Sequence, residues 1–244
     1  MRRSLRNRVR RLVRRGVRRR QGWTRGVIMA QVRSPKAQED RTMADDTWVQ
    51  YYQAVQGRPP RPLFLAALAA FEADGFEPAG AQAVDLGCGD GTETMALLAR
   101  GWRVLAIDRE PAASARVLPG VPEVARTRLD TQVASFEGVT LLPADFVYAG
   151  LSLPFCPPEQ FPAVWGRVVA AVRPGGRFVG HLFGERDSWN GDPEMTFHTA
   201  AELQQRFAGF TIESLNEVEN DRPTALGEPK HWHIYEVVAR RRNG

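Results

Sequence analysis

A short apolar segment that runs directly into three alternate glycines is the feature that most constrains this chain. Residues 84–94 read Val-Asp-Leu-Gly-Cys-Gly-Asp-Gly-Thr-Glu-Thr, so an expected strand delivers Gly87, Gly89 and Gly91 to the start of an expected helix. Glycine is needed where the backbone adopts positive φ or lies against a ligand. A helix N-terminus offers unpaired N–H groups and a partial positive charge. The pattern therefore indicates a ligand-binding turn in a parallel sheet.

Segments of strand and helix character alternate along the chain from Trp48 to Arg240. Such alternation is typical of parallel strands joined by right-handed crossovers. The last two expected strands have no helix between them and are expected to pair antiparallel around 222–229. The sequence thus predicts an α/β fold, a Rossmann-like doubly wound seven-stranded sheet that is mostly parallel with a C-terminal antiparallel hairpin. The expected strands are 83–86, 103–107, 128–136, 145–149, 177–183, 211–218 and 231–239, and the expected helices are 48–55, 62–71, 92–100, 110–118, 158–172 and 199–207.

An acid at the end of the second expected strand, Asp108, indicates the kind of ligand. A carboxylate there can accept two hydrogen bonds from ribose hydroxyls, so with the glycine turn it favours an adenosine-containing cofactor. The nicotinamide fingerprint G-x-G-x-x-G would need a glycine where Thr92 stands. Asp85, two residues before the first glycine, would repel a pyrophosphate but suits an ammonium or a sulfonium. A cofactor with an amino acid tail and no phosphates fits better.

With these features the chain resembles the class I S-adenosylmethionine-dependent methyltransferases, in particular their small-molecule, tellurite-resistance-like group. The stretch 84–94 is similar to their first motif, Asp108 to the acid that ends their second strand, and the turn 173–176, Arg-Pro-Gly-Gly, to the one before their fifth strand. The resemblance covers roughly 48–240 and implies S-adenosylmethionine as cofactor. The Asn-Pro-Pro-Tyr or Asp-Pro-Pro-Tyr motif of many nucleic-acid amino-methylating enzymes does not occur in the segment after the fourth expected strand.

The resemblance also implies roles for single residues. His181, in the fifth expected strand, is the candidate general base, since a hydroxyl or ammonium acceptor must lose a proton and histidine titrates near neutral pH. A thiol or a softer acceptor atom would need no base. For Tyr52 and for each histidine, a purely structural role is the alternative. The candidate cofactor-binding residues are Asp85, Gly87, Cys88, Gly89, Gly91, Asp108, Arg109, Ser135, Phe136, Gly150 and Tyr52, and the candidate substrate residues are Phe155, Trp189, His198 and His231.

The N-terminal 42 residues differ in charge from the rest of the chain. They hold 15 of the 33 Lys and Arg residues and two acids, so residues 43–244 have a formal charge of −8, although the whole chain has +5. A net-negative domain is a poor partner for a phosphate backbone. We expect 1–42 to be a disordered Arg-rich arm or a segment upstream of a native start at Met43, and 43–244 to be the domain. A membrane anchor, a nucleic-acid grip or a transit peptide are the alternatives for the arm.

The remaining composition narrows the class of protein. The two cysteines make no disulfide framework, no Cys/His spacing predicts a metal site, and no apolar run reaches the roughly 18–20 residues of a membrane span. The cysteine content makes a reducing, cytoplasmic setting the expectation. The resemblance then implies a methyltransferase, and the net-negative domain favours a small-molecule acceptor. The alternatives are a nicotinamide-dependent oxidoreductase, an RNA methyltransferase that uses the basic arm, and a binding module that has lost the chemistry.

Overall fold

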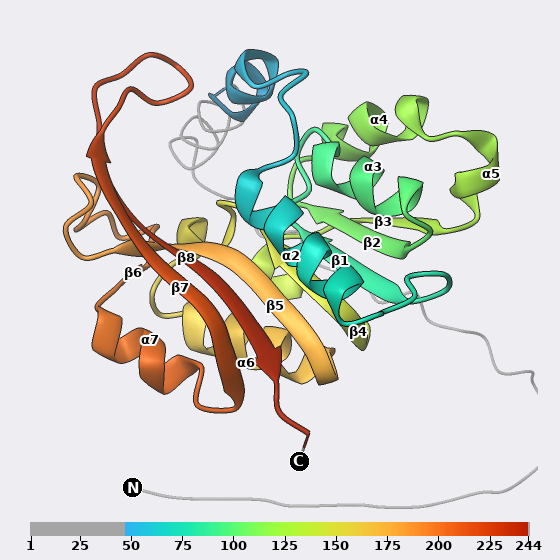
Figure 1. Cartoon of the computed structure of the whole chain (residues 1–244). Coiled ribbons are helices and arrows are strands. Elements are labelled where there is room, and N and C mark those ends of the chain that lie inside the picture. The colour runs from blue at the N-terminus through green and yellow to red at the C-terminus, as the bar shows by residue number, and fades with distance from the viewer. Residues whose placement is uncertain (1–46, 244) are drawn as a thin grey trace, which may run out of the picture.

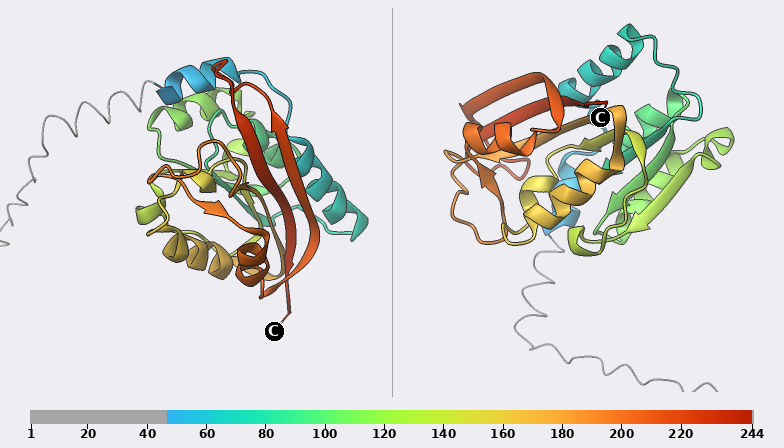
Figure 2. Two further views of the ribbon diagram at one scale, coloured as in Figure 1. Left: turned by 90° about the vertical axis from the view of Figure 1, so that its left-hand side faces the viewer. Right: turned by 90° about the horizontal axis from the view of Figure 1, so that it is seen from below.

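The computed structural model describes residues 47–243, so the whole predicted arm lies outside the described residues. A twisted sheet forms the centre, with helices on both faces (Figures 1 and 2). The strand order is β3-β2-β1-β4-β5-β8-β7, and only the β5–β8 and β7–β8 pairs are antiparallel. The strands are β1 Gln82–Leu86, β2 Arg103–Asp108, β3 Leu129–Val133, β4 Ala144–Ala149, β5 Val172–Gly184, β6 Phe197–His198, β7 Phe210–Asp221 and β8 His231–Arg241.

The predicted fold is confirmed, with one strand more than expected. The additional strand is β6, which pairs in parallel with β5 beside the main path. Its two residues are too few to produce a sequence pattern, so only the pairing reveals it. The helices of the described part are a segment over 47–54, α2 Pro62–Ala73, α3 Thr92–Ala99, α4 Ala112–Val117, α5 Glu123–Arg126, α6 Phe161–Ala171 and α7 Ala200–Arg206, with short 3₁₀ turns η1 Leu118–Gly120, η2 Phe136–Gly138 and η3 Leu153–Phe155.

Side chains that alternate along the central strands divide the core into two layers. On β4, Phe146 and Tyr148 belong to the layer under α2, α3 and α4, whereas Val147 and Ala149 belong to the layer under α6 and α7. Trp102 anchors the first layer, with its ring centroid 5.3 Å from that of Phe71. Within residues 47–243, no helix is long and apolar enough to cross a membrane. The two layers of the core show that the apolar faces of the helices pack against the sheet.

Several element boundaries differ from the expected ones. The strand β5 begins at Val172 and runs through the segment 173–176, for which we expected a turn. Gly176 permits this because a Cβ there would lie 2.8 Å from the carbonyl oxygen of Asp145 on β4, so only glycine lets the two backbones approach so closely. The strand β3 ends at Val133, three residues before the expected end. Close backbone approach at Gly176, rather than the apolar pattern, thus accounts for the early start of β5.

The strand order reverses between β1 and β4, whose neighbours on either side are β2 and β5. In a parallel sheet, such a switch point opens a crevice at the carboxyl ends of the strands. The turn after β1, the tip of β2 and the segments after β3 and β4 all meet at this crevice. The fold therefore places the predicted cofactor residues of four separate segments at one end of the sheet.

Candidate functional site

A cavity of about 580 Å³ occupies this end of the sheet. Its floor is formed by the turn after β1 and by the residues that follow β2, β3 and β4. The helix 47–54 and the tip of the β7–β8 hairpin, residues 224–228, line it from above, and both lie at the same end of the molecule in Figure 1. A volume of this size is typical of small-molecule and cofactor sites.

The glycine turn has the backbone that the sequence pattern predicts. Gly87, Gly89 and Gly91 have φ values of 83°, 54° and 80°, a region that L side chains rarely adopt. A Cβ at Gly87 would meet Ser152, and a Cβ at Gly89 would lie 2.6 Å from Cε1 of Tyr52. Gly91 is the N-cap residue of α3. The three glycines thus let the chain pass closely under neighbouring side chains.

Asp108 connects the turn, the second strand and the helix 47–54. Its Oδ2 accepts hydrogen bonds from the backbone N–H of Gly89, at 2.8 Å, and from the hydroxyl of Tyr52, at 3.3 Å. Its Oδ1 accepts one from the backbone N–H of Glu110, at 2.9 Å. The Asp108 side chain lines the cavity although the residue is 7% exposed. The carboxylate is therefore held rigidly at the position where a ribose is expected.

Asp85 lies behind the turn and is not among the cavity-lining residues. Its Oδ2 accepts a hydrogen bond of 2.6 Å from the hydroxyl of Thr94 on α3. Burial, together with the charge of Glu93, raises the pKa of Asp85 to about 7. In this structure the side chain joins β1 to α3, so the expected position beside the cofactor is corrected to one beneath the turn.

An ion pair that sequence analysis did not identify closes the side of the cavity next to α3. Arg58 donates two hydrogen bonds to Glu93, of 2.7 and 2.6 Å, and lies 3.5 Å from Asp90. Burial opposes ionisation of Glu93, but the hydrogen bonds and charge of Arg58 outweigh it and lower the pKa of Glu93. The pairing joins segments 35 residues apart, so no local pattern could have predicted it.

Two further polar groups of the cavity wall have no hydrogen-bond partner. These buried atoms are Nε of Arg61 and the hydroxyl oxygen of Tyr148. Among the described residues, the guanidinium of Arg61 forms no ion pair and donates one hydrogen bond, to the hydroxyl of Tyr51 at 3.5 Å. The backbone N–H of Arg61 donates to Glu93 at 3.1 Å. Burial raises the pKa of Tyr148 well above its ordinary value, so the hydroxyl keeps its proton. Buried polar groups are rarely left unpaired, and these two are available to a polar ligand group.

The structure brings most of the predicted cofactor residues together. Gly91 lies behind the cavity, where its Cα faces Val117. Burial raises the pKa of Cys88 well above its ordinary value, so its thiol is neutral. The predicted residues that line the cavity are Tyr52, Gly87, Cys88, Gly89, Asp108, Arg109, Ser135, Phe136, Gly150, Phe155 and Trp189.

The three histidines of the prediction do not line the cavity. His181 is buried in β5, with Nε2 3.8 Å from Glu236, and burial lowers its pKa to about 3. His198 is buried against Phe161, and burial lowers its pKa to about 4. His231 lies on the outside of the hairpin, paired with Asp221 and Glu219. His181 and His198 are packed in the interior, and His231 forms ion pairs outside the cavity. The prediction that these three histidines lie at the site was therefore wrong.

One wall of the cavity is aromatic. We call Phe155, Phe183, Trp189 and Trp232 the aromatic wall; all four line the cavity. Their rings are in contact, with centroids 5.6–6.3 Å apart between neighbours. Phe183 and Trp232 are not among the substrate residues predicted above. The hairpin tip 224–228 was also missed, because nothing in a loop sequence shows that the loop folds back over the sheet.

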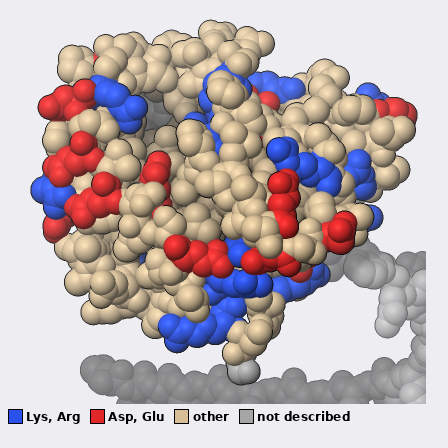
Figure 3. Space-filling view, viewed as in Figure 1, with Lys and Arg blue, Asp and Glu red and all other residues tan. Residues whose placement is uncertain are grey.

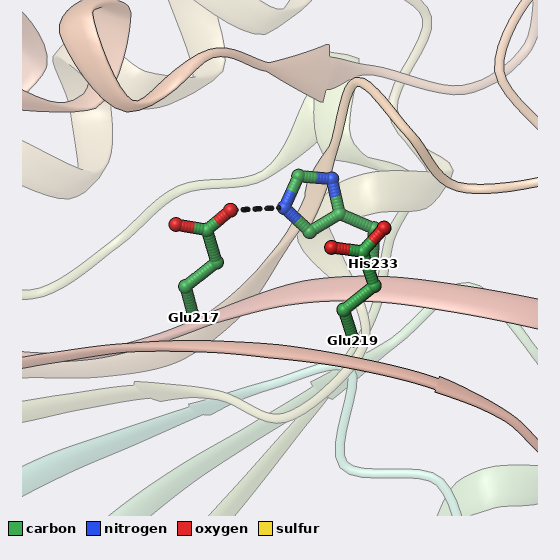
Figure 4. A group of neighbouring side chains, drawn as sticks. All are labelled: Glu217, Glu219 and His233. Atoms are coloured by element: carbon green, nitrogen blue, oxygen red, sulfur yellow. Dashed lines mark hydrogen bonds and ion pairs between the residues drawn. The ribbon is translucent and has the colours of Figure 1, made fainter.

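A second group of titratable side chains lies outside the cavity. Glu217, Glu219 and His233 place their ligand atoms within 4.8 Å of one another, as a metal site would (Figure 4). The backbone N–H of Arg186 donates to Nδ1 of His233, so the imidazole proton is on Nε2, which donates to Glu217. The guanidinium of Arg186 binds both glutamates. In this structure the cation that these carboxylates hold is therefore Arg186.

Comparison with known proteins shows a likeness to methyltransferases over the central part of the chain. Residues 83–176 match the model of the methyltransferase domain family. A carboxy-S-adenosyl-L-methionine synthase from Chromohalobacter salexigens is 33% identical over 105 residues. That match covers 41% of this chain and 39% of the relative, so the chain matches well under half of that protein's length.

Solved structures share the fold. TehB from Haemophilus influenzae has a TM-score of 0.58 at 16% identity, over 72% of this chain and 62% of that chain. A 1,6-didemethyltoxoflavin-N1-methyltransferase from Burkholderia thailandensis, solved with its acceptor and S-adenosylhomocysteine, has a TM-score of 0.57 at 22% identity, over 88% of this chain and 94% of that chain. Together with the family match, these likenesses confirm the predicted resemblance and S-adenosylmethionine as the cofactor of the family.

Proposed function

We propose that this chain is a class I S-adenosylmethionine-dependent methyltransferase and that it transfers a methyl group to a small organic acceptor. One observation carries the proposal. The same cavity joins the glycine turn and Asp108, on one side, to the aromatic wall, on the other. The first side suits a nucleoside and the second an apolar acceptor, so a single cavity holds both reactants next to each other.

The residues of the cavity fit the cofactor. The Asp108 carboxylate suits ribose hydroxyls, and Arg109, Ser135 and Phe136 lie on the side where the resemblance places the adenine. The unpartnered Nε of Arg61 and the hydroxyl of Tyr148 would satisfy the carboxylate of the amino acid tail. When bound, S-adenosylmethionine supplies a methyl group already activated by its sulfonium.

The chemistry left to the protein is alignment of the acceptor. Holding two reactants in the reacting geometry removes much of the entropic part of the barrier. Among the described residues, no histidine lines the cavity, so the chain does not place an imidazole where it would remove a proton. An acceptor atom with a free lone pair, such as a ring nitrogen or a thiolate, fits this site better than a hydroxyl of ordinary pKa.

The charge distribution favours a small acceptor over a nucleic acid. On the face of the molecule in Figure 3, acidic and basic side chains are intermixed and form no continuous basic surface. Residues 43–244 have a formal charge of −8, which opposes binding of a phosphate backbone. Turnover with the true acceptor is therefore expected to change little between low and physiological salt, whereas a polyanionic substrate would give a steep loss of affinity.

Calorimetric titration tests the cofactor, and a labelling assay tests the reaction. S-adenosylmethionine and S-adenosylhomocysteine should bind, and NAD should not. Purified protein incubated with methyl-labelled S-adenosylmethionine and a fractionated metabolite extract should label a compound of low molecular mass. Binding of NAD without binding of S-adenosylmethionine would refute the cofactor assignment. Label recovered only in RNA or protein would refute the small acceptor.

A further inference from the structure

We propose that the acceptor is a neutral, planar aromatic ring system that stacks on the aromatic wall. The inference rests on the proposed function and specifies its substrate class. Four rings reach the wall from four separate segments: Phe155 from η3, Phe183 from β5, Trp189 from the loop after β5 and Trp232 from β8. Trp48 of the helix 47–54 extends the same set of rings, and its ring centroid lies 5.0 Å from that of Phe155.

A buried ion pair beside the wall fixes its two indoles. Lys230 and Asp187 form an ion pair in which both side chains are fully buried. Asp187 also accepts hydrogen bonds from the backbone N–H groups of Trp189, at 3.0 Å, and of His233, at 3.2 Å. The indole N–H of Trp232 donates to the carbonyl oxygen of Arg222, at 2.9 Å. Trp232 therefore offers a ligand its fixed ring rather than a free hydrogen-bond donor.

The same lysine argues against a cationic acceptor. Aromatic walls also bind cations, because the face of each ring carries a negative partial charge. Here the ammonium of Lys230 lies 3.6 Å from the ring centroid of Trp189 and 4.5 Å from that of Trp232. The ammonium already makes the cation–π contact with these two rings, which leaves less of their surface for a second cation. Glu194 and Glu228 are exposed at the mouth, where water and salt weaken their attraction for a cation.

Stacking distinguishes a flat ring from an aliphatic ligand of equal size. Aromatic pairs gain binding energy beyond the area that they bury, because offset and edge-to-face arrangements match their partial charges. Rings that already meet one another at interplanar angles of 59–71° offer both faces and edges. An aliphatic acceptor would use none of this directional interaction.

Binding of matched probes to the full chain tests the proposal. The probes are 2-naphthol, decahydro-2-naphthol and choline, titrated with and without S-adenosylhomocysteine. The two naphthols share a carbon skeleton and a hydroxyl and differ in aromaticity, and choline is the cation. We expect 2-naphthol to bind about tenfold more tightly than its saturated counterpart, and choline to bind most weakly.

Three variants test whether the preference for 2-naphthol over its saturated counterpart comes from the aromatic wall. Trp189→Leu should abolish most of the tenfold preference, and Trp189→Phe should retain it, because only the second keeps a ring. Trp165→Phe is the control, since Trp165 packs against Phe207 in the layer under α6 and α7, away from the cavity. S-adenosylhomocysteine should bind all three variants as it binds the original chain.

Each other result has a definite meaning. Equal binding of the two naphthols, or no binding of either, would overturn the planar acceptor, and so would tighter binding of choline. A preference for 2-naphthol that survives Trp189→Leu would place the ligand elsewhere and overturn the role of the wall. Failure of S-adenosylhomocysteine to bind would count against the proposed function instead, and the titrations without it would still report on the wall.

Discussion

Tyr52 lies directly over Gly89, so that the helix 47–54 covers the glycine turn. A Cβ at residue 89 would be 2.6 Å from Cε1 of Tyr52, and the backbone there has φ of 54°. The guanidinium of Arg116 lies over the ring of Tyr52, 4.1 Å from the ring centroid. The turn and the helix above it are therefore packed as one unit, and a side chain at residue 89 would separate them.

Gly89→Val is expected to abolish binding of S-adenosylmethionine, because the branched side chain opposes positive φ and displaces Tyr52. Calorimetric titration measures this. Gly57→Ala is the control: Gly57 has φ of 76° but nothing within 4 Å of its Cβ position, so strain occurs there without a collision. The control should lose some stability and bind the cofactor normally. Full affinity in Gly89→Val would show that the ligand lies elsewhere.

Asp108→Asn is expected to weaken binding of S-adenosylmethionine by about 1.5–3 kcal/mol, the value of a hydrogen bond to a charged group. The variant keeps the size of the side chain, so the comparison isolates the charge. Asp130→Asn, on the neighbouring strand β3 and exposed, is the control and should have no effect. Unchanged affinity in a folded Asp108→Asn protein would contradict the ribose assignment.

Arg61→Met should weaken the binding of S-adenosylmethionine by about 1.5–3 kcal/mol, because a hydrogen bond to a charged group is lost. The binding of methylthioadenosine should be weakened far less. Methylthioadenosine has the same nucleoside but no amino acid tail, so the difference between the two ligands isolates the carboxylate contact. Parallel titrations of the variant and the original chain provide the measurement. Equal weakening of both ligands would mean that Arg61 acts by shaping the cavity rather than by binding the tail.

Lys230→Met should lower the free energy of unfolding by about 3–5 kcal/mol, because it leaves the buried carboxylate of Asp187 without its partner. Urea denaturation followed by circular dichroism measures the change. Arg173→Met is the matched control, since Arg173 pairs with Asp145 at 2.6 Å but is 45% exposed. Exposed pairs contribute about 0–1 kcal/mol. Similar small losses in both variants would show that the Lys230–Asp187 pair does not hold the wall.

His198→Leu should reduce the loss of unfolding free energy that the original chain shows as the pH is lowered. Burial lowers the pKa of His198 to about 4 from an unfolded value of 6.5, so between these pH values the unfolded chain binds a proton that the folded chain does not. Stability therefore falls as the pH falls through this window, by roughly 2–3 kcal/mol. At pH 7.5 the variant should be at least as stable, because both ring nitrogens of His198 are buried without partners.

Thermal melting between pH 4 and 7.5 measures this effect. His231→Gln is the control, because the hydrogen bonds that His231 donates to Asp221 and Glu219 raise its pKa instead of lowering it. That variant should keep the loss of stability toward acid pH. An unchanged acid slope in His198→Leu would mean that other groups, such as buried His181, account for the whole effect.

The cofactor side of the site was predictable because its signal is local. The turn from Gly87 to Gly91 follows one strand directly, and Asp108 ends the next strand, so each can be identified within about ten residues of sequence. Parallel strands then bring their carboxyl ends to one edge without further information. The placement of Asp85 was wrong because burial beneath α3 depends on how that helix packs.

The sequence by itself determined the α/β alternation, the terminal hairpin and the residues of the turn, because period, glycine spacing and strand length are properties of neighbouring residues. Only the tertiary structure decided which aromatic rings meet, that Arg58 pairs with Glu93, and that the three predicted histidines lie outside the cavity lining. Trp189 and Trp232 are 43 positions apart and belong to different segments, yet their ring centroids lie 5.6 Å apart. Contacts of this kind depend on the register of β8 against β5 and on the burial that follows from it, and no local pattern encodes either.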